Sequence, residues 1–224
     1  MKYYVIFCHG WAGDRNFWNH LSSWFAKNSS NILGTVFLDL GYFGEPCLNL
    51  PKDLQQSENI NFIGIGHSIG LIKLLSLNIK FKALIGLQSF INFLGNNSVL
   101  RKKRTIELAA LKKQFNINPI DTLKNFYKLA NLNVNIDKYN CLNKNRLIED
   151  LDLLFLDFKL DQTTPLLIIG AIDDVIVPSE LILDNFGNLD YVTIDMLDFG
   201  QHSVGYRNAE LIYKKIIGFI DAVN

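Results

Sequence analysis

Cysteine is scarce in this sequence of 224 residues. Its three cysteines, Cys8, Cys47 and Cys141, are odd in number and lie far apart along the chain. Zinc sites and disulfide frameworks need closely paired cysteines. The sequence therefore predicts thiols that are free or buried, with neither a zinc site nor a disulfide framework.

The sequence also lacks net charge and long hydrophobic runs. Its 22 lysine and arginine residues balance 22 aspartate and glutamate residues, whereas a protein whose main partner is nucleic acid normally has a strongly basic surface. No uninterrupted apolar run is long enough to span a membrane, and residues 1–10, MKYYVIFCHG, lack the apolar core and cleavage site of a signal peptide. We expect a cytoplasmic protein that has neither nucleic acid nor a membrane as a partner.

A dinucleotide-binding motif is missing too. The first apolar run, 3–7, leads into Cys-His-Gly-Trp at 8–11 and not into G-x-G-x-x-G. Asp39, which follows the next apolar run, is therefore not interpreted as an acid that binds a ribose. Because no metal-binding pattern is present either, we expect a protein without a metal or an organic cofactor.

What the sequence does contain is an alternation of strands and helices. Short apolar runs typical of buried strands occur at 3–7, 35–38, 62–65, 82–87, 165–170 and 191–196. Helical spacing of apolar residues occurs at 14–27, after residue 69 and from residue 208. This order predicts an α/β fold, with a mostly parallel, twisted sheet and helices on both of its faces. The length suits a single domain over residues 1–224.

The pattern changes between residues 96 and 160, where strands disappear. Helical stretches alternate there with asparagine-rich breaks at 131–135 and 140–145. We interpret 96–160 as a small helical cap, inserted in the domain over the carboxyl edge of the sheet. The basic run Arg-Lys-Lys-Arg at 101–104 opens this segment, and such a run is more often a solvated face than a binding site.

The pentad Gly-His-Ser-Ile-Gly at 66–70 lies between a short apolar run and a helical pattern. In this context G-x-S-x-G is a nucleophile elbow, a tight turn that carries a serine between a strand and a helix. Gly66 and Gly70 suit the turn because side chains at these positions would collide with the neighbouring strand or helix. We predict Ser68 as a nucleophile and the N–H of Ile69, at a helix N-terminus, as one donor of an oxyanion hole.

A second donor is predicted after the first strand. The order of strand, His-Gly turn and helix around 8–14 is the place where a hydrolase with such an elbow carries its other oxyanion donor. The N–H of Trp11 is expected to serve there, with its indole lining the acyl pocket. His9 is expected to brace the loop by hydrogen bonding. Phe90 follows the strand predicted at 82–87 and is expected near the same pocket.

Later segments offer candidates for a base and an acid. His202 precedes the last helical pattern, whereas two other histidines belong to the oxyanion loop and the elbow, and His20 lies on the first helical stretch. The pair Asp173 and Asp174 follows the strand predicted at 165–170. The chain order serine, aspartate, histidine is that of a Ser-His-Asp triad built on an elbow. On this pattern alone, either aspartate is a candidate to orient His202.

With these residues in place, the chain resembles the α/β-hydrolases and, among them, the pimeloyl-acyl-carrier-protein methyl ester esterases. Residues 5–18, VIFCHGWAGDRNFW, are similar to the family's strand, His-Gly-Trp loop and helix, and 37–44, FLDLGYFG, to its turn Val-Asp-Leu-Pro-Gly-Phe-Gly. The resemblance covers nearly the whole chain. It implies a serine carboxylesterase of biotin synthesis that cleaves an acyl methyl ester through an acyl-enzyme. It also implies an acyl carrier protein as partner, docked on basic cap residues such as 101–104 and Lys124.

The resemblance also bears on the acid. In that family the acid stands three residues after a glycine and four before a proline; Asp173 meets the first spacing and Asp174 meets the second. A gapless count from Pro165 to Pro178 favours Asp174, with Ala171 at the glycine position. Asp174 is therefore the predicted acid of the triad.

Two other functions stay open at this point. A thioesterase or a C–C bond hydrolase uses the same triad, and a panel of methyl esters, thioesters and diketones separates these activities. A non-catalytic binding protein of the same fold is the other alternative. The intact serine, aspartate and histidine argue against it, because loss of catalysis usually removes one of them.

Overall fold

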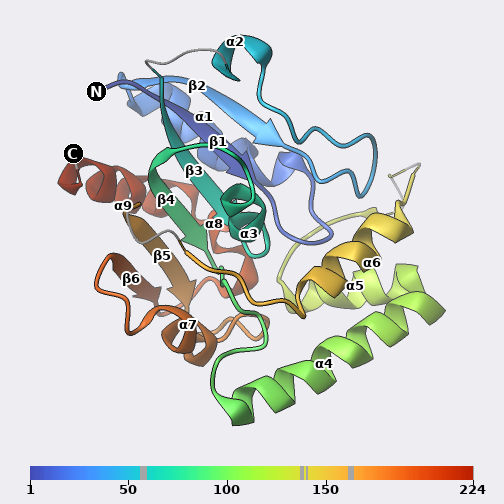
Figure 1. The fold of residues 1–224 in the computed structure, drawn as a ribbon. Helices are drawn as coiled ribbons and strands as arrows, with labels where there is room; N and C mark the ends of the chain where they lie inside the picture. The colour runs from blue at the N-terminus through green and yellow to red at the C-terminus, as the bar shows by residue number, and fades with distance from the viewer. Residues whose placement is uncertain (56–59, 137–138, 140, 161–163, 224) are drawn as a thin grey trace.

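The computed structural model describes residues 1–55, 60–136, 139, 141–160 and 164–223. These residues form a six-stranded sheet in the order β2-β1-β3-β4-β5-β6, in which every neighbouring pair is parallel (Figure 1). The strands are β1 (Tyr3–Cys8), β2 (Ile32–Leu38), β3 (Asn61–His67), β4 (Phe81–Leu87), β5 (Leu166–Ala171) and β6 (Val192–Leu197). The predicted α/β fold with a parallel sheet is therefore confirmed.

The strand order reverses at β1, whose two neighbours are β2 and β3. In open parallel sheets, such a reversal leaves a crevice at the carboxyl ends of the strands, where ligands bind. The loop after β1 carries Trp11, and the turn after β3 carries Ser68. The sheet order therefore brings two of the predicted site residues to one crevice.

Side chains of the strands alternate between two buried faces. Val5 and Phe7 of β1 belong to the core on one face, while Ile6 and Cys8 belong to the core on the other. All four are fully buried. Burial on both faces explains why the strands have continuous apolar runs instead of alternating apolar and polar residues.

Helices cover both faces of the sheet (Figure 1). The core on one face is closed by α1 (Asn19–Asn28), α8 (Val204–Arg207) and α9 (Ala209–Ala222). The core on the other face is closed by α3 (Gly70–Leu75) and α7 (Ser179–Phe186). The short α2 (Lys52–Gln55) stands between β2 and β3 in the chain.

The helix after the elbow is shorter than the sequence pattern predicted. Apolar residues recur at helical spacing as far as Ile79, but α3 ends at Leu75. The backbone N–H and the hydroxyl of Ser76 both donate to the carbonyl of Ile72, which closes the last turn. Ile79 packs against the core from the connection to β4 and not from a helix.

Between β4 and β5, the residues that the structure describes form three α-helices: α4 (Ser98–Ile117), α5 (Pro119–Leu129) and α6 (Lys144–Leu153). We call them the insertion helices. They lie beyond the carboxyl ends of the strands, on the right of Figure 1. Their buried leucines, such as Leu108 and Leu147, join the core on the α3 side of the sheet.

The insertion helices occupy the segment in which helices and no strands were expected. The break predicted at 131–135 is non-helical, whereas Asn140, in the second predicted break, lies outside the described residues. That residues 96–160 act as a cap stays a prediction.

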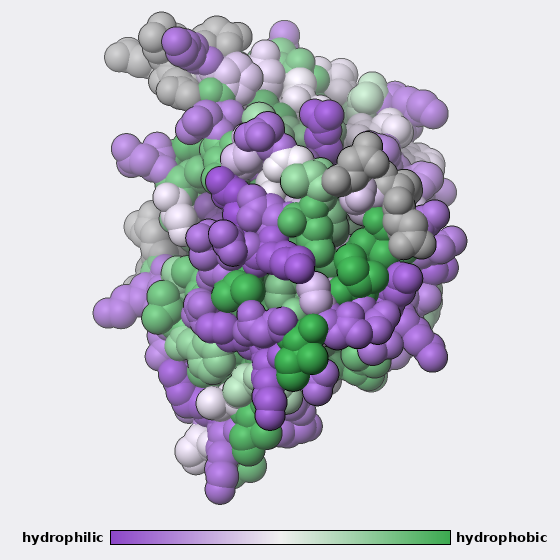
Figure 2. All heavy atoms as spheres, turned by 90° about the vertical axis from the view of Figure 1, so that its right-hand side faces the viewer, coloured by the Kyte–Doolittle hydropathy of each residue, from purple (hydrophilic) through white to green (hydrophobic). Residues whose placement is uncertain are grey.

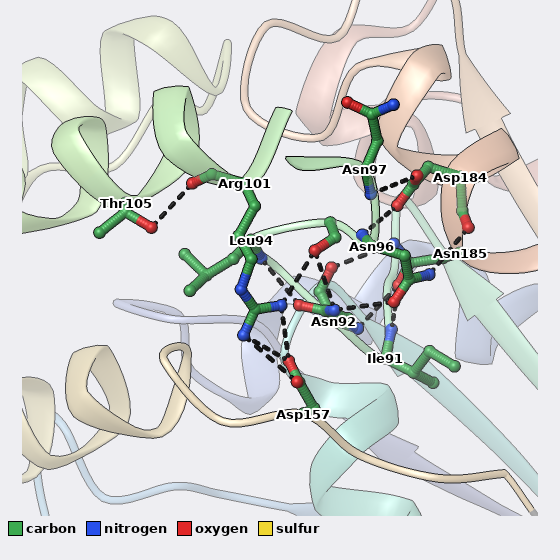
Figure 3. A network of polar contacts seen from close by, with 11 residues as sticks. Ile91, Asn92, Leu94, Asn96, Asn97, Arg101, Thr105, Asp157, Asp184 and Asn185 are labelled. Carbon is green, nitrogen blue, oxygen red and sulfur yellow. Dashed lines mark hydrogen bonds and ion pairs between the residues drawn. The ribbon is translucent and has the colours of Figure 1, made fainter. Parts of the chain in front are cut away.

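A polar network fixes the start of α4 to α7 (Figure 3). Asp184 of α7 accepts hydrogen bonds from the N–H groups of Asn96 and Asn97, and the Asn97 side chain caps α4. Asn185 accepts from the N–H groups of residues 91–92 and donates to the carbonyl of Asn92. Side chains of α7 therefore hold two parts, 91–92 and 96–97, of the loop that leads from β4 into α4.

The surface on the insertion side is mostly hydrophilic, with separate hydrophobic patches (Figure 2). Exposed apolar side chains on the insertion helices include Val99, Ile106, Ile117 and Leu129.

Within the described part of the chain, no helix has both the length and the apolar content that crossing a bilayer requires.

Candidate active site

Ser68 occupies the turn between β3 and α3, as the pentad predicted. Its φ of 54° lies in the left-handed region, which costs a residue other than glycine on the order of 1–3 kcal/mol. The turn is held by two hydrogen bonds, from the N–H of Ser68 to the carbonyl of Leu87 and from the N–H of Leu71 to the carbonyl of Ser68. Strain at a residue with a reactive side chain is typical of functional sites.

The two glycines of the pentad are required by backbone contacts. A Cβ on Gly66 would lie 2.4 Å from the amide nitrogen of Leu71, and a Cβ on Gly70 would lie 2.2 Å from the carbonyl oxygen of Cys8. Neither neighbour is the end of a flexible side chain. The steric reason given for these glycines from the sequence is therefore confirmed.

Two backbone N–H groups near Ser68 are available as hydrogen-bond donors. The N–H groups of Trp11 and Ile69 donate no hydrogen bond to any residue that the structure describes. The loop that carries Trp11 packs directly on the elbow, because a Cβ on Gly10 would lie 3.2 Å from Cβ of Ser68. Trp11, Ser68 and Ile69 all line the same cavity. An oxyanion hole needs donors that are free in this way, and the oxyanion role of Trp11 and Ile69 stays a prediction.

His9 braces the Trp11 loop, as expected. Its Nδ1 bonds to the carbonyl of Gly10 at 2.9 Å, and its Nε2 accepts the N–H of Leu40 at 3.0 Å. The bond from Leu40 requires an unprotonated Nε2, so the Nδ1–H is the donor to Gly10. His9 is fully buried and ties the loop after β1 to the chain after β2.

His202 and Asp174 form a buried pair. His202 Nδ1 lies 2.8 Å from Asp174 Oδ2, and the two residues are 1% and 2% exposed. Asp174 Oδ1 accepts two further hydrogen bonds, from the N–H groups of Ile176 at 2.8 Å and Val177 at 3.0 Å. In the neutral tautomer that donates Nδ1–H to the carboxylate, Nε2 has no proton and is able to accept one.

Asp173 has a different set of contacts. Its carboxylate accepts the N–H groups of Gln201 at 2.8 Å and Gly200 at 3.3 Å, and the side chain is exposed. It holds the backbone just before His202, whereas Asp174 holds the imidazole. The geometry therefore separates two neighbouring aspartates that the sequence pattern alone left as alternatives.

Two further side chains, which sequence reasoning did not identify as part of the site, hold the His202 segment from the sheet side. His67 donates Nε2–H to the carbonyl of His202 at 2.8 Å, with the two ring centres 4.7 Å apart. Burial lowers the pKa of His67 well below its ordinary value, so the ring is neutral near pH 7. Gln88, with φ of 44°, donates Nε2–H to the carbonyl of Gln201 at 2.7 Å.

The contact from His67 has a consequence for the site, because His67 directly precedes Ser68. It ties the elbow to the segment that carries His202, although 135 positions separate the two residues in the chain. A histidine beside a predicted nucleophile was a signal available in the sequence. Gln88 gave none, because a single glutamine after a strand has no chemical pattern.

A cavity of about 260 Å³ opens beside Ser68. Its wall is mainly apolar, and besides Ser68, Trp11 and Ile69 it consists of residues from the insertion helices and two neighbouring loops. These are Phe90, Phe93, Arg104, Glu107, Leu108, Leu111, Thr122, Asn125, Phe126, Leu129, Leu151, Leu154, Val175 and Ile176. Both side chains expected at a substrate pocket, Trp11 and Phe90, line this cavity.

Hydrogen bonds at two places connect α6 to the elements at the edge of the sheet. The indole Nε1–H of Trp11 donates to the carbonyl of Leu147 at 2.9 Å. The carboxylate of Asp150, a buried residue, accepts both the hydroxyl of Tyr42 and the ammonium group of Lys73. The cavity wall on α6 is therefore bonded to the Trp11 loop and to α3.

A larger depression, of about 1190 Å³, lies over α1 and α9. Residues such as His20, Trp24 and Lys214 line it, and it contains neither Ser68 nor the two available N–H groups. The smaller cavity is the candidate active site because it combines a strained serine, backbone donors and an apolar wall.

The basic run 101–104 does not form one basic surface. Arg104 is 5% exposed and lines the cavity, and Arg101 makes a forked ion pair with Asp157. Lys102 and Lys103 are exposed. Arg104, which was among the residues expected to dock a partner, is therefore not available on the surface, and docking on the other basic residues stays a prediction.

Metal ligands do not gather in the described ranges. No group of three or more histidine, cysteine, aspartate or glutamate side chains lies there in an arrangement that could hold a metal ion. The three cysteines are unpaired thiols, with Cys8 buried and Cys47 and Cys141 exposed.

Comparisons with known proteins identify the fold. The sequence matches no protein-family model and no curated protein sequence. An esterase from Exiguobacterium antarcticum superposes with a TM-score of 0.75 at 15% identity, over 98% of this chain and 92% of that chain. A lipase-esterase related protein from Clostridium acetobutylicum gives 0.68 at 17% identity, over 96% and 93%. A bromoperoxidase from Bacillus anthracis gives 0.69 at 15% identity, over 99% and 92%.

The chain has the α/β-hydrolase fold. The parallel sheet and the similar structures agree on this, and the predicted fold is confirmed. Proteins similar in structure to this chain include esterases, bromoperoxidases and epoxide hydrolases. The fold alone therefore does not name the reaction, which has to be argued from the site.

Proposed function

We propose that the protein is a serine esterase that hydrolyses acyl esters through a Ser68-His202-Asp174 triad. One observation carries the proposal: the carbonyl of His202, the histidine of the buried His202-Asp174 pair, accepts a hydrogen bond from His67, which directly precedes the strained Ser68 and its cavity with two available N–H groups. A candidate nucleophile, a base with an orienting acid, and unbonded backbone donors are the parts that a serine hydrolase needs.

In the first half of the reaction, Ser68 Oγ attacks the ester carbonyl carbon as its proton passes to His202 Nε2. Negative charge develops on the carbonyl oxygen, where the N–H groups of Trp11 and Ile69 donate to it. Asp174 holds the ring and stabilises the imidazolium. The C–O bond to the alcohol then breaks, and His202 gives its proton to the leaving oxygen.

In the second half, water replaces the alcohol. His202 takes a proton from water, the hydroxide attacks the acyl-enzyme carbonyl, and the same donors hold the oxyanion. Collapse of this intermediate returns the proton to Ser68 Oγ and releases the carboxylic acid. Every step uses groups of this chain and water.

The finer proposal concerns the substrate: an acyl methyl ester, with pimeloyl-acyl-carrier-protein methyl ester in biotin synthesis as the expected case. The resemblance of residues 5–18 and 37–44 to that family supports it. The mainly apolar cavity supports an aliphatic acyl chain. We propose Lys102 and Lys103, the exposed members of the basic run, as contacts for an acidic carrier protein.

The test uses a fluorophosphonate probe and mass spectrometry of the labelled peptide. We expect one adduct, on Ser68, and none in Ser68→Ala. A folded wild-type protein that stays unlabelled would contradict the triad. A parallel panel of p-nitrophenyl esters, methyl esters, thioesters and diketones then identifies the bond that is cleaved, and faster turnover of thioesters or diketones would overturn the methyl ester.

A further inference from the structure

Arg104 is a buried arginine on α4, at the wall of the cavity. It is 5% exposed, and its guanidinium carbon lies 4.2 Å above the ring centre of Phe93. Nη1 donates to Glu107 Oε2 at 3.2 Å, and Nη2 donates to the carbonyl of Ile176 at 2.6 Å. The bond to Ile176 is the shorter one, and it reaches the loop that carries Asp174.

The peptide group between Ile176 and Val177 is bonded on both sides. Its carbonyl oxygen accepts Nη2 of Arg104, and its N–H donates to Asp174 Oδ1 at 3.0 Å. A charged donor on the carbonyl polarises an amide and strengthens the hydrogen bond from its N–H. One peptide group therefore links a cation on α4 to the carboxylate that holds His202.

We propose that Arg104 is a positioning residue, which fixes the Ile176-Val177 peptide so that Asp174 stays oriented toward His202. The proposal rests on the triad proposed above. Arg104 touches no reacting atom in this role; it acts through the peptide and Asp174.

Burial of the charged guanidinium of Arg104 is unfavourable, and a residue that only anchored α4 would not have to be buried. Removal from water lowers its pKa from the ordinary value, while Glu107 acts in the opposite direction. The start of α4 already has its own anchors, Asp184 on α7 and the pair of Arg101 with Asp157 (Figure 3). Arg104 is therefore not the only attachment of the helix. What it adds is a hydrogen bond to the acid loop.

The position of Arg104 also joins the acyl pocket to the acid loop. Glu107, Leu108 and Leu111 of α4 line the cavity with it. A ligand in the cavity therefore contacts the same helix that holds the Ile176-Val177 peptide. Displacement of α4 would loosen the hydrogen bond to Asp174 without any change in Ser68.

The kinetic test compares Arg104→Met with Arg101→Met. The two arginines lie one turn apart on α4, but Arg101 bonds to Gly95 and Asp157 and not to the acid loop. With p-nitrophenyl acetate and a longer-chain p-nitrophenyl ester, we expect Arg104→Met to lower kcat about 10- to 100-fold with little change in KM. We expect the same factor for both esters and less than a twofold change for Arg101→Met.

A role in acyl binding predicts the opposite pattern. Arg104→Met would then raise KM, and the effect would grow with chain length while kcat stayed the same. That result, or a kcat equal to wild type, overturns the proposal. Arg104→Lys, which keeps the charge and one donor, is expected to recover part of kcat, and no recovery over Arg104→Met counts against the proposal.

A spectroscopic readout separates this proposal from the proposed function. The Nδ1–H of His202, bonded to Asp174, gives a far-downfield proton resonance that is observable without turnover. We expect it in wild type and Arg101→Met, and broadened or absent in folded Arg104→Met. An unchanged resonance overturns the positioning role even if wild type proves inactive. If neither Arg104→Met nor Arg104→Gln folds, Arg104 serves the stability of the fold, and the proposal fails.

Discussion

The carboxyl edge of the sheet and the insertion helices build one cavity by different means. At the edge, the backbone sets the positions: Ser68 has a positive φ, Gly70 lies against a carbonyl oxygen, and Trp11 and Ile69, which line the cavity, have N–H groups without a hydrogen bond in the described residues. On the insertion helices, side chains such as Phe126 supply surface. In the proposed function, the edge therefore provides the chemistry, whereas the insertion helices provide the shape of the cavity.

Polar contacts connect the two regions, and three sets of them involve residues of the candidate site or its wall. The indole of Trp11 donates a hydrogen bond to the carbonyl of Leu147. The carboxylate of Asp150 accepts hydrogen bonds from Tyr42 and Lys73. Arg104 donates a hydrogen bond to the carbonyl of Ile176 in the acid loop. Substitutions at the edge should therefore change kcat strongly. On the insertion helices, substitutions of cavity-lining side chains other than Arg104 should mainly change KM.

The largest contrast is expected between Ser68→Ala and Phe126→Leu. Without the nucleophile, kcat for a short p-nitrophenyl ester should fall by at least about 10⁴-fold, because only oxyanion binding and positioning remain. Phe126→Leu keeps the triad and should change kcat less than about tenfold, with most of its effect on KM for long acyl chains. Equal losses of kcat in the two variants would break the comparison.

The two neighbouring aspartates give the next contrast, within the edge itself. Asp174→Asn should lower kcat by about 10⁴-fold, because the amide favours the wrong tautomer of His202. Asp173→Asn keeps an acceptor for the N–H of Gln201 and loses at most one exposed hydrogen bond, so a loss below about tenfold is expected. Steady-state kinetics of both variants decide this, and the reverse ranking would give the catalytic role to Asp173.

A smaller effect should appear in stability as the pH falls. The folded-state pKa of His67 is lowered by burial, while the unfolded chain has the ordinary pKa near 6.5. Below about pH 6.5 the unfolded state binds a proton that the folded state does not, so the free energy of unfolding decreases by about 1.4 kcal/mol per pH unit for this group.

His67→Gln removes this titration and keeps a side-chain N–H for the carbonyl of His202. Urea unfolding between pH 7 and pH 5 should therefore show a shallower decline for His67→Gln than for wild type. His20→Gln is the control, because His20 is exposed and on α1. An identical pH slope in His67→Gln and wild type would show that His67 is not buried in its neutral form.

The smallest effect concerns the exposed lysines of α4. If Lys102 and Lys103 attract an acidic carrier protein, kcat/KM for a carrier-linked methyl ester should fall several-fold from low to physiological salt, where the Debye length is about 8 Å. A p-nitrophenyl ester should show no such change. Replacement of both lysines by glutamine should remove the salt effect, and equal salt dependence of the two substrates would leave these lysines as a solvated face.

The sequence was most informative where local chemistry fixes the structure. Strands buried on both faces have continuous apolar runs, and the elbow requires glycines at 66 and 70, so the sheet and the position of Ser68 could be predicted. The separate contacts of Asp173 and Asp174 depend on where the chain after β6 lies. Residue spacing supplied only a preference between them.

Long-range contacts set the limit of prediction. In the sequence, Arg104 is part of a charged run. In the structure, its side chain donates a hydrogen bond to the carbonyl of Ile176, 72 positions away in the chain. Gln88 meets the His202 segment across 113 positions. No local sequence pattern predicts such long-range hydrogen bonds, because they depend on how separate elements pack.

The sheet order has a consequence for fragments of this protein. Ser68 and the oxyanion donors come with β1 and β3, whereas Asp174 and His202 follow β5 and β6. A break in the chain anywhere between β4 and β5 therefore gives two pieces, neither of which holds a complete triad. If the proposed function holds, ester hydrolysis by the mixed pieces would require β4 and β5 to pair again, so the recovered activity would report on reassembly of the sheet.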